Sequence, residues 1–331
     1  MSNPGMDADV FEQFIEQLQR YVRDRLLPAE KEIIESDAIP DDILSEMRDM
    51  GLFGLTIPEE YGGAGMNVSE PGSGSDSAGL QTTATQTDNG WVLSGTKRYI
   101  TNSPFAKVGL IMARTSKENL PKNSHVSAFV VPFDAPGISI GKSDKKMGQS
   151  GSHIADIVMD DVRVGGEALL GGELGKGFAY AMMSLDNGRM SVGAAATAYA
   201  RRALDSAVRY ATERKAFGEP IANFQLIQQM LAQSEIDIYA AECMMDDVTR
   251  RADAGENVLR KAAAFKVFAS EMCGRVVDAC VQVYGGAGYL AEYDAERFFR
   301  DARIYRIYEG TTQILQLQIA KHMLREFAAA N

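Results

Sequence analysis

The sequence predicts a multi-domain α+β fold in which helices come first, a β domain follows and a helical bundle ends the chain. Apolar residues recur at helical spacing over residues 7–60 and again toward the C-terminus, whereas residues 80–165 read as short strands separated by turns. Because helices and strands occupy separate stretches, the chain lacks the alternation of a βαβ array. We expect an N-terminal helical domain at 1–66, a middle β-barrel or β-sandwich domain at 67–170 and a helical bundle at 171–331.

The N-terminal helices are predicted by two stripes of apolar residues. Pro40 separates the stripes, since proline cannot continue a helix through its own position. The first stripe is Val10, Phe14, Leu18 and Tyr21, and the second is Ile43, Met47 and Leu52.

The β domain is predicted by alternating sequences joined by turn residues. LQTTATQT alternates with period two and runs into Asn89-Gly90, a strong hairpin signal, after which WVLSGTKRYIT returns. Further strands are expected at 108–114, 127–132, 137–142 and 155–164, each bounded by turn-forming residues.

The C-terminal bundle is predicted by small and apolar residues at steps of three and four. Helices are expected in the alanine-rich stretch 190–211, around Ile227–Ile238 and over 257–284. The stripe in the last of these suits close antiparallel packing; it consists of Ala262, Phe265, Ala269, Met272, Val276, Ala279 and Val283.

Composition and charge exclude several classes of function. The 34 basic and 45 acidic side chains give a net charge of −11, so the chain lacks the basic footprint of a nucleic-acid-binding protein. No apolar run reaches eighteen residues and the N-terminus is acidic, so we expect no membrane insertion and no secretory signal. The expected compartment is the bacterial cytoplasm, or the mitochondrial matrix for a processed eukaryotic form.

The cysteines and histidines predict neither a disulfide framework nor a metal site. Three cysteines without paired spacing fit a reducing compartment, and Cys273 and Cys280, seven residues apart, are expected to pack on one helix face. The three histidines are too scattered for a metal cluster or a Ser-His pair. No G-x-G-x-x-G follows a strand, and LGGELGKGF (170–178) departs from a P-loop in its first glycine and in Gly177.

Three short motifs are ambiguous when each is taken alone. SEPGSGSD (69–76) could let its backbone and hydroxyls approach a ligand, but a surface turn is the more ordinary reading. TKRYITNS (96–103) reads as a strand end. RIYEGTTQI (306–314) places Glu309 ahead of a helix that Thr311 or Thr312 could cap, where a glutamate usually interacts with the helix dipole.

The order of these motifs resembles that of the acyl-CoA dehydrogenase family. SEPGSGSD is followed by YITN, LDNGRM, RKAFGEPIANFQ, QVYGGAGY and RDARIYRIYEGT, and the resemblance runs across nearly the whole chain. It implies an acyl-CoA dehydrogenase-like fold: a helical N-terminal domain, a middle β domain and a C-terminal four-helix bundle, with FAD bound between the last two.

The resemblance also implies the catalytic and substrate residues. Glu309 matches the family's base, which takes the α-proton of an acyl-CoA while the β-hydrogen leaves as hydride to flavin N5. A desolvated carboxylate with a raised pKa suits that proton transfer. Gly188 stands where a minority of members carry the base. Substrate contacts are implied for Ser75, Asp186, Arg189, Tyr308 and Gly310.

FAD contacts are implied for two groups of residues. One group would bind the chain's own flavin: Ser69, Gly74, Ser75, Tyr99, Thr101, Thr311 and Gln313. The other would reach the FAD of a neighbouring subunit, with Arg214 suited to the pyrophosphate: Arg214, Phe217 and Gln225. Gln282 and Gly286 match the family's segment under the adenine side. The implied assembly is a homotetramer, a dimer of dimers.

One departure from the family pattern bears on activity. In the family, EEYGG is followed by roughly sixty residues, about three helices of average length, before the SEPG segment. Here EEYGG (59–63) meets VSEPG after only AGMN. The expected function is dehydrogenation of an acyl-CoA with electrons passed to an electron-transfer flavoprotein. The alternatives are a flavoprotein of the same fold with impaired dehydrogenation and oxygen-reactive flavin, and a non-catalytic scaffold subunit.

Overall fold

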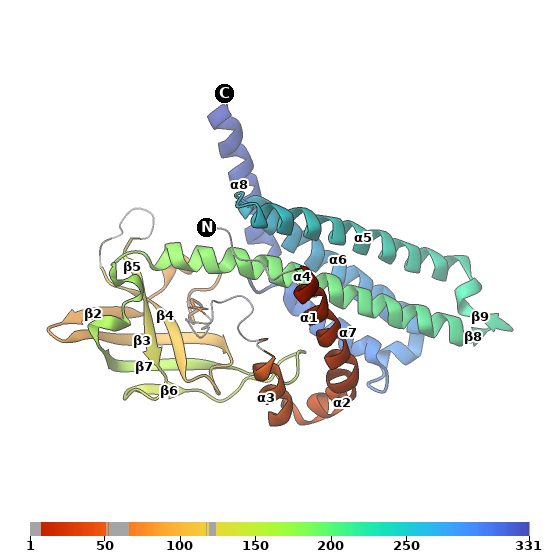
Figure 1. The fold of residues 1–331 in the computed structure, drawn as a ribbon, viewed down its shortest axis with the longest axis horizontal. Coiled ribbons are helices and arrows are strands. Elements are labelled where there is room, and N and C mark those ends of the chain that lie inside the picture. The colour runs from red at the N-terminus through yellow and green to blue at the C-terminus, as the bar shows by residue number, and fades with distance from the viewer. Residues whose placement is uncertain (1–7, 51, 53–65, 117, 119–123, 331) are drawn as a thin grey trace.

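The N-terminal part of the molecule is helical. The structure is a computed structural model that describes residues 8–50, 52, 66–116, 118 and 124–330 (Figure 1). Helix α1 (Ala8–Tyr21) continues through a π-helical turn (Val22–Leu26) into α2 (Leu27–Ser36), and α3 (Asp41–Asp49) begins after Pro40. The predicted break at Pro40 is therefore confirmed. EEYGG and the two residues that follow it lie outside the described residues.

The middle part is one seven-stranded sheet. Its strands are β1 (Met66–Asn67), β2 (Thr83–Thr87), β3 (Gly90–Thr101), β4 (Val108–Arg114), β5 (Val126–Pro132), β6 (Ile138–Ile140) and β7 (Ile154–Val164). The order is β1-β4-β2-β3-β7-β6, with β5 also paired to β4. The predicted hairpin is confirmed, as are the later strands. Because Thr87 pairs with Gly90, its turn residues are Asp88 and Asn89, one position earlier than the predicted Asn89-Gly90.

The sheet has a packed core on one side and a helix on the other. Leu93, Ile111 and Phe129 are fully buried in the larger cluster, which Trp91 joins with its ring centroid 5.2 Å from that of Phe129. On the other side Phe178 and other residues at the start of α4 pack against the sheet. The sheet is thus fixed to the helix that leads into the bundle.

The C-terminal part is a bundle built around two long helices. Its helices are α4 (Gly177–Glu213), α5 (Gln225–Asp253), α6 (Leu259–Tyr284), α7 (Asp294–Ala302) and α8 (Thr312–Ala330). With 37 residues, α4 is about 55 Å long, and Figure 1 shows it running from the sheet to the far end of the bundle. There the chain turns back through a small hairpin of β8 (Lys215–Ala216) and β9 (Glu219–Pro220).

Helix α6 lies at the centre of the bundle and confirms the predicted stripe. Of the seven stripe residues, six are buried and Ala279 is partly exposed. Close approach of α4 requires a glycine, because a Cβ at Gly193 would lie 2.4 Å from the Phe265 ring. Cys273 and Cys280 are buried on α6, and burial raises the pKa of each thiol to about 12, so both are packing residues as predicted.

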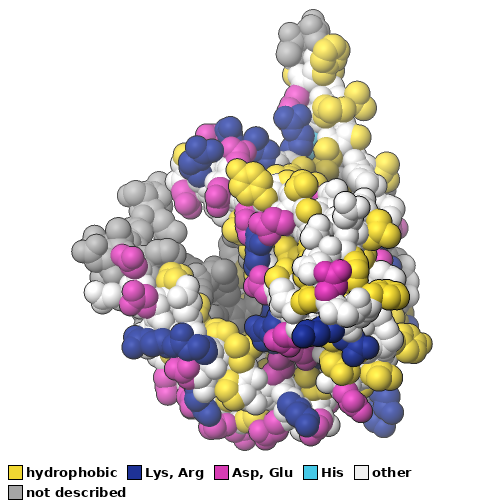
Figure 2. All heavy atoms as spheres, turned by 90° about the vertical axis from the view of Figure 1, so that its right-hand side faces the viewer, with side chains coloured by type: hydrophobic (Ala, Val, Ile, Leu, Met, Phe, Trp, Pro, Cys, Tyr) yellow, Lys and Arg dark blue, Asp and Glu magenta, His cyan; other side chains and the backbone are white. Residues whose placement is uncertain are grey.

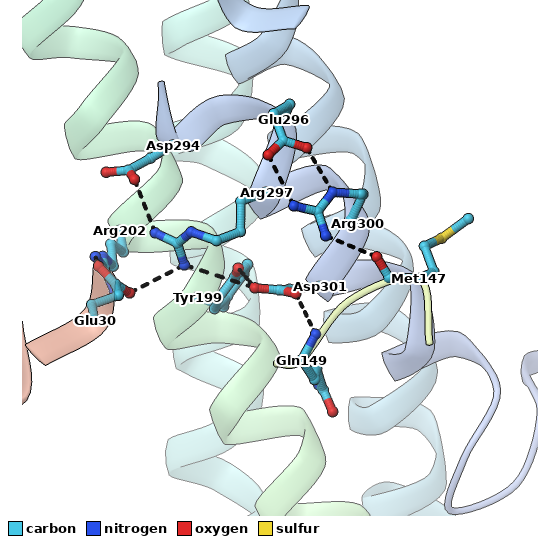
Figure 3. Close-up of polar contacts among 10 residues, drawn as sticks. All are labelled: Glu30, Met147, Gln149, Tyr199, Arg202, Asp294, Glu296, Arg297, Arg300 and Asp301. Atoms are coloured by element: carbon cyan, nitrogen blue, oxygen red, sulfur yellow. Dashed lines mark hydrogen bonds and ion pairs between the residues drawn. The ribbon is translucent and has the colours of Figure 1, made fainter. Parts of the chain in front are cut away.

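A polar network joins the N-terminal helices, the middle domain and the bundle (Figure 3). Arg297 of α7 lies 3.1 Å from Glu30 of α2, which also pairs with a second arginine, from α4. Asp301 accepts hydrogen bonds from the Tyr199 hydroxyl, at 3.0 Å, and from the backbone N–H of Gln149. Because Asp301 is mostly buried, these contacts fix the 146–149 segment against the bundle.

Within the described residues, no helix is long and apolar enough to cross a membrane. In the same part of the chain, no group of three His, Cys, Asp or Glu side chains is placed to hold a metal ion.

Candidate active site

Glu309 lies in a strained turn whose side chain faces α4. The turn connects the 3₁₀ segment Arg303–Arg306 to α8, and Glu309 and Gly310 have φ of +54° and +93°. Positive φ is uncommon for a residue other than glycine and occurs often at functional sites. The Glu309 Oε2 atom is buried, has no hydrogen-bond partner among the residues that the structure describes, and lies 2.6 Å from where a Cβ would stand on Gly188.

Two cations and a low-polarity environment set the acidity of Glu309. Burial raises the pKa of its carboxyl above the ordinary value, and Arg189 and Lys266 oppose that effect in part. Arg189, next to Gly188 on α4, is only 4% exposed, and Lys266 on α6 is fully buried. The result is a buried carboxylate with increased basicity beside a guanidinium, which suits a base in proton transfer.

The raised pKa predicts a pH-dependent gain in stability on removal of the charge. Glu309→Gln should raise the thermal unfolding midpoint at neutral pH, since the wild-type carboxylate is harder to ionise in the folded than in the unfolded state. The gain should be full above the folded-state pKa and vanish below the unfolded value, about 4.3. Thermal unfolding of both proteins across pH measures it. A difference in unfolding midpoint between the two proteins that does not change with pH would contradict the raised pKa of Glu309.

The contact between Gly188 and Glu309 predicts that Gly188→Ala impairs the site without unfolding the protein. The added methyl would meet only the end of the Glu309 side chain, and alanine favours the helix by about 1 kcal/mol over glycine. Since a displacement near 1 Å can cost roughly 10²-fold in rate, we expect a loss of about that size in turnover. Ser191→Ala, an exposed change one turn along α4, is the control and should have wild-type turnover. Equal turnover rates for Gly188→Ala and Ser191→Ala would show that activity does not depend on the present position of the Glu309 carboxylate.

The SEPGSGSD loop is held against the sheet by a buried ion pair. The Lys97 ammonium of β3 lies 2.7 Å from the Glu70 carboxylate, and neither side chain is more than 4% exposed. Glu70 also accepts the backbone N–H groups of Gln81 and Thr82, at 2.5 and 3.1 Å. The loop is therefore anchored through its glutamate.

The rest of the loop projects outward from this anchor. The backbones of Glu70 and Ser73 exchange hydrogen bonds, which closes the loop into a tight turn. Gly74 and Ser75 are exposed, and no atom of the described residues lies within 4 Å of where a Cβ would stand on Gly74. The outer edge of the loop is therefore open to a ligand.

The predicted flavin residues of β3 lie next to this loop. The backbone N–H of Arg98 donates to the Ser69 carbonyl at 2.9 Å, so Ser69 and the following Tyr99 are neighbours. Tyr99 has φ of +59° where the β3–β7 register shifts, and its side chain is 61% exposed. Bulges of this kind redirect side chains at binding sites. Thr101, two residues on, is also exposed.

The second group of predicted FAD residues lies at the opposite end of the molecule. Phe217 and Gly218, with φ of +53° and +93°, form the two-residue turn of the β8–β9 hairpin and leave the Phe217 ring 96% exposed. Arg214 and Gln225 flank this hairpin and are exposed. Figure 1 shows the hairpin at the end of α4 that is remote from the sheet.

Gln282 and Gly286 belong with the hairpin end of the bundle. Tyr210, near the end of α4, stacks on Tyr284 with ring centroids 4.0 Å apart, which brings the end of α6 to the same place. Gln282 and Gly286 flank Tyr284 and are exposed. The predicted cofactor residues of the loop and β3 thus lie apart from those at the hairpin end of the bundle.

The remaining predicted residues lie on either side of the turn and on α4. Tyr308 is half-buried, and Thr311 caps α8 by accepting the backbone N–H of Ile314 at 3.3 Å. Gln313 is exposed on the first turn of α8. Asp186 lies on α4, and its side chain is outside the described residues.

Family models match the chain over most of its length. The acyl-CoA dehydrogenase N-terminal, middle and C-terminal domain models match residues 9–72, 65–162 and 175–324.

The chain belongs to the acyl-CoA dehydrogenase family.

Relatives of this chain include two bacterial proteins. The cyclohexane-1-carbonyl-CoA dehydrogenase of Geobacter metallireducens is 33% identical, over 95% of this chain and 97% of the relative. The caffeyl-CoA reductase–Etf complex subunit CarC of Acetobacterium woodii is also 33% identical, over 89% of this chain and 93% of the relative.

Solved structures of the family have the same fold. Butyryl-CoA dehydrogenase from Megasphaera elsdenii superposes with a TM-score of 0.89 at 29% identity, covering 98% of this chain and 100% of that one. An acyl-CoA dehydrogenase complexed with FAD from Bacillus anthracis gives 0.87 at 29% identity, covering 98% and 70%. The predicted acyl-CoA dehydrogenase-like fold is therefore confirmed.

Members of this family depend on FAD, and the chain has residues that fit it. The serine-glycine loop offers hydroxyls and open backbone, the β3 bulge presents an exposed aromatic ring, and the hairpin presents a second ring beside Arg214. Exposed rings and hydroxyls of this kind suit an aromatic ring system and a pyrophosphate.

Four charged residues that support the site were not among the sequence predictions. They are Glu70 and Lys97, which anchor the loop, and Lys266 and Glu271, which contact the Glu309 turn. A signal existed for Lys266, because a lysine inside the apolar sequence AAAFKVFAS is placed where a helix is buried. Nothing in the sequence showed what its ammonium would bind.

Proposed function

We propose that this chain catalyses FAD-dependent α,β-dehydrogenation of an acyl-CoA thioester to a trans-2-enoyl-CoA. The observation that carries this proposal is the Glu309 carboxylate, buried against Gly188 with an unpartnered oxygen and a raised pKa. An α-proton of a thioester is weakly acidic, so its removal needs a base that is desolvated and fixed in direction.

The chain's own residues would remove the proton, stabilise the developing charge and contact the substrate. The Glu309 carboxylate accepts the α-proton, and backbone N–H groups of the Glu309–Gly310 turn hydrogen-bond the thioester carbonyl, where negative charge develops. Arg189 and Tyr308 border the acyl-CoA beside the turn, and Ser75 contacts it from the loop. FAD, when bound between the loop and the bundle, supplies the hydride acceptor.

We further propose that the protein works as a homo-oligomer, a dimer of dimers, in which each hairpin completes the FAD site of a neighbour. Two groups of cofactor residues at opposite ends of one chain support this arrangement. Figure 2 looks onto the hairpin end and shows hydrophobic side chains there and along the projecting α8. Exposed large apolar residues at this end and on α8 are Phe217, Leu226, Tyr289, Leu317, Leu324 and Phe327.

The hairpin proposal predicts a selective effect of Phe217→Ala. Because the ring is 96% exposed, its loss should leave the unfolding midpoint of the cofactor-free protein unchanged, whereas FAD affinity should fall roughly tenfold. Titration of the apoprotein with FAD measures the affinity, with Phe299→Ala on α7 as an exposed aromatic control. Unchanged FAD affinity would remove the hairpin from the cofactor site.

An electron-transfer flavoprotein is the proposed electron acceptor. Support comes from the Acetobacterium woodii relative, which is a subunit of a caffeyl-CoA reductase–Etf complex. Reduction of an electron-transfer flavoprotein by acyl-CoA, in the presence of this enzyme, would test the pairing directly.

A second candidate is a flavoprotein of the same fold with impaired dehydrogenation. It is favoured by the alignment to the Geobacter relative, which runs over 372 positions although this chain has 331 residues, so the relative has residues without a counterpart here. If the missing part is the expected wall of the acyl pocket, water would reach the base and weaken it.

Anaerobic addition of butyryl-, octanoyl- or isovaleryl-CoA to the FAD-loaded protein separates the candidates. Bleaching of the oxidised flavin spectrum supports dehydrogenation and ranks the three acyl groups. Flavin that stays oxidised with every acyl-CoA, yet consumes oxygen after chemical reduction, supports the impaired flavoprotein. Failure to bind FAD at all supports the scaffold.

A further inference from the structure

Helix α6 holds the Glu309 turn from one side through two charged residues. The Lys266 ammonium donates to the Gly310 carbonyl at 2.7 Å. Glu271, just over one turn further on, accepts hydrogen bonds from Arg306 at 2.9 Å and from the Thr312 hydroxyl at 2.7 Å. These hydrogen bonds hold the chain at Arg306 before the turn, at Gly310 within it and at Thr312 after it.

The turn needs such support because its backbone is unfavourable. Glu309 and Gly310 both have positive φ, and a non-glycine residue in that region costs of order 1–3 kcal/mol unless its surroundings determine it. A hydrogen bond to the Gly310 carbonyl can fix the backbone of the turn. The Lys266 side chain that donates this bond is fully buried. A charge-assisted hydrogen bond of this kind is stronger than a neutral one.

Lys266 also interacts electrostatically with the Glu309 carboxylate. Glu309 on the turn and Glu271 on α6 favour its ammonium form, whereas Arg189 on α4 opposes it. Burial outweighs the two carboxylates and lowers the pKa of Lys266 to about 8, so the residue is still protonated at neutral pH. The charge of Lys266 in turn lowers the pKa of Glu309, and the charge of Arg189 acts in the same direction.

We propose that Lys266 is a positioning residue, which fixes the Glu309–Gly310 turn through the Gly310 carbonyl and favours the ionised form of the base. The part that concerns catalysis rests on the proposed dehydrogenation, whereas the part that concerns the turn stands on the geometry alone. Lys266 touches neither the substrate nor FAD in this proposal. It acts through Glu309.

Two substitutions separate the hydrogen bond from the charge. Lys266→Met removes both, and Lys266→Gln keeps an N–H donor without the charge. Both should move the acid limb of the pH–rate profile to higher pH, because Glu309 loses a neighbouring cation while Arg189, Glu271 and the Tyr308 hydroxyl remain. The flavin reduction rate at saturating acyl-CoA should fall about 10–100-fold in Lys266→Met and less in Lys266→Gln.

The test combines hydrogen exchange with kinetics. Amide exchange of residues 305–315 should accelerate in Lys266→Met but not in the control Ser270→Ala, a fully buried polar residue one turn along α6 whose hydroxyl bonds only its own helix. Unchanged exchange in that segment, or acceleration spread evenly over the whole protein, would overturn the positioning role. If the wild-type flavin is not reduced by acyl-CoA, the proposed function fails while exchange still tests the turn. If the acid limb of the pH–rate profile stays at the wild-type pH in both variants, the charge of Lys266 does not favour ionised Glu309 and the electrostatic part of the proposal is refuted.

Discussion

Glu309→Gln should slow reduction of the bound flavin by acyl-CoA roughly 10³-fold, within the range that general bases contribute, while the protein stays yellow. The amide has nearly the shape of the carboxylate but cannot accept the α-proton. The carboxylate lies against Gly188 with one oxygen unpartnered, so the replacement should leave the surroundings of the turn in place. The predicted FAD residues on the loop and β3 belong to other elements and are untouched.

Stopped-flow absorbance of the flavin under anaerobic conditions measures this effect. Glu167→Gln, the same chemical change on the surface of the middle domain, serves as control and should reduce its flavin at the wild-type rate. Bleaching that survives in Glu309→Gln at an undiminished rate would mean that another group is the base. In wild type, the rate should fall as pH drops through the raised pKa of Glu309, since the protonated acid cannot act as a base.

Breaking the buried pair of Glu70 and Lys97 is expected to have the largest effect on stability. Lys97→Met should lower the free energy of unfolding by about 3–5 kcal/mol, because it leaves the Glu70 carboxylate buried without its cation. The loop that carries Ser69 and Ser75 depends on that carboxylate through two backbone hydrogen bonds, so FAD affinity should fall as well.

Urea unfolding of a double-mutant cycle measures the coupling between these two residues. The variant with both Glu70→Gln and Lys97→Met should be more stable than Lys97→Met alone, because it contains no unpaired buried charge. Arg114→Met, a partly buried cation on β4, is the control. Additive losses from the two substitutions would show that the pair is not coupled.

The same pair predicts the acid sensitivity of the middle domain. Burial raises the pKa of Glu70, but Lys97 and the N–H of Gln81 together outweigh it, so the pKa lies below its usual range. The carboxylate therefore contributes stability above its unfolded pKa, and this contribution is lost as pH falls through the lower, folded value. Lys97→Met should reduce that dependence.

Local sequence was sufficient to predict most of the secondary structure. The Asn89-Gly90 hairpin, the strands after it and the break at Pro40 depend on residue types that restrict the backbone within a few positions. The α6 stripe was predicted because side-chain burial repeats with the helix period. The boundaries at 66/67 and 170/171 stay predictions.

The candidate site was predicted less completely. Order and identity of the motifs were enough to place Glu309, Tyr99 and Phe217, yet in isolation each motif had an ordinary reading as a turn or a strand end. The structure adds that all three residues have positive φ, a backbone property that their residue types do not favour. Surrounding contacts hold them there, and such contacts cannot be read from neighbours in the chain.

The sequence by itself determined which elements form, in what order, and to which family the chain belongs, because these follow from local patterns and motif order. Only the tertiary structure decided which distant residues meet: Glu309 with Gly188, Lys266 with Gly310, and Glu70 with Lys97. It also separated the hairpin of Phe217 from the SEPGSGSD loop by the length of α4. The physical reason is that burial and charge pairing depend on distances across the fold, which residue spacing along the chain does not specify.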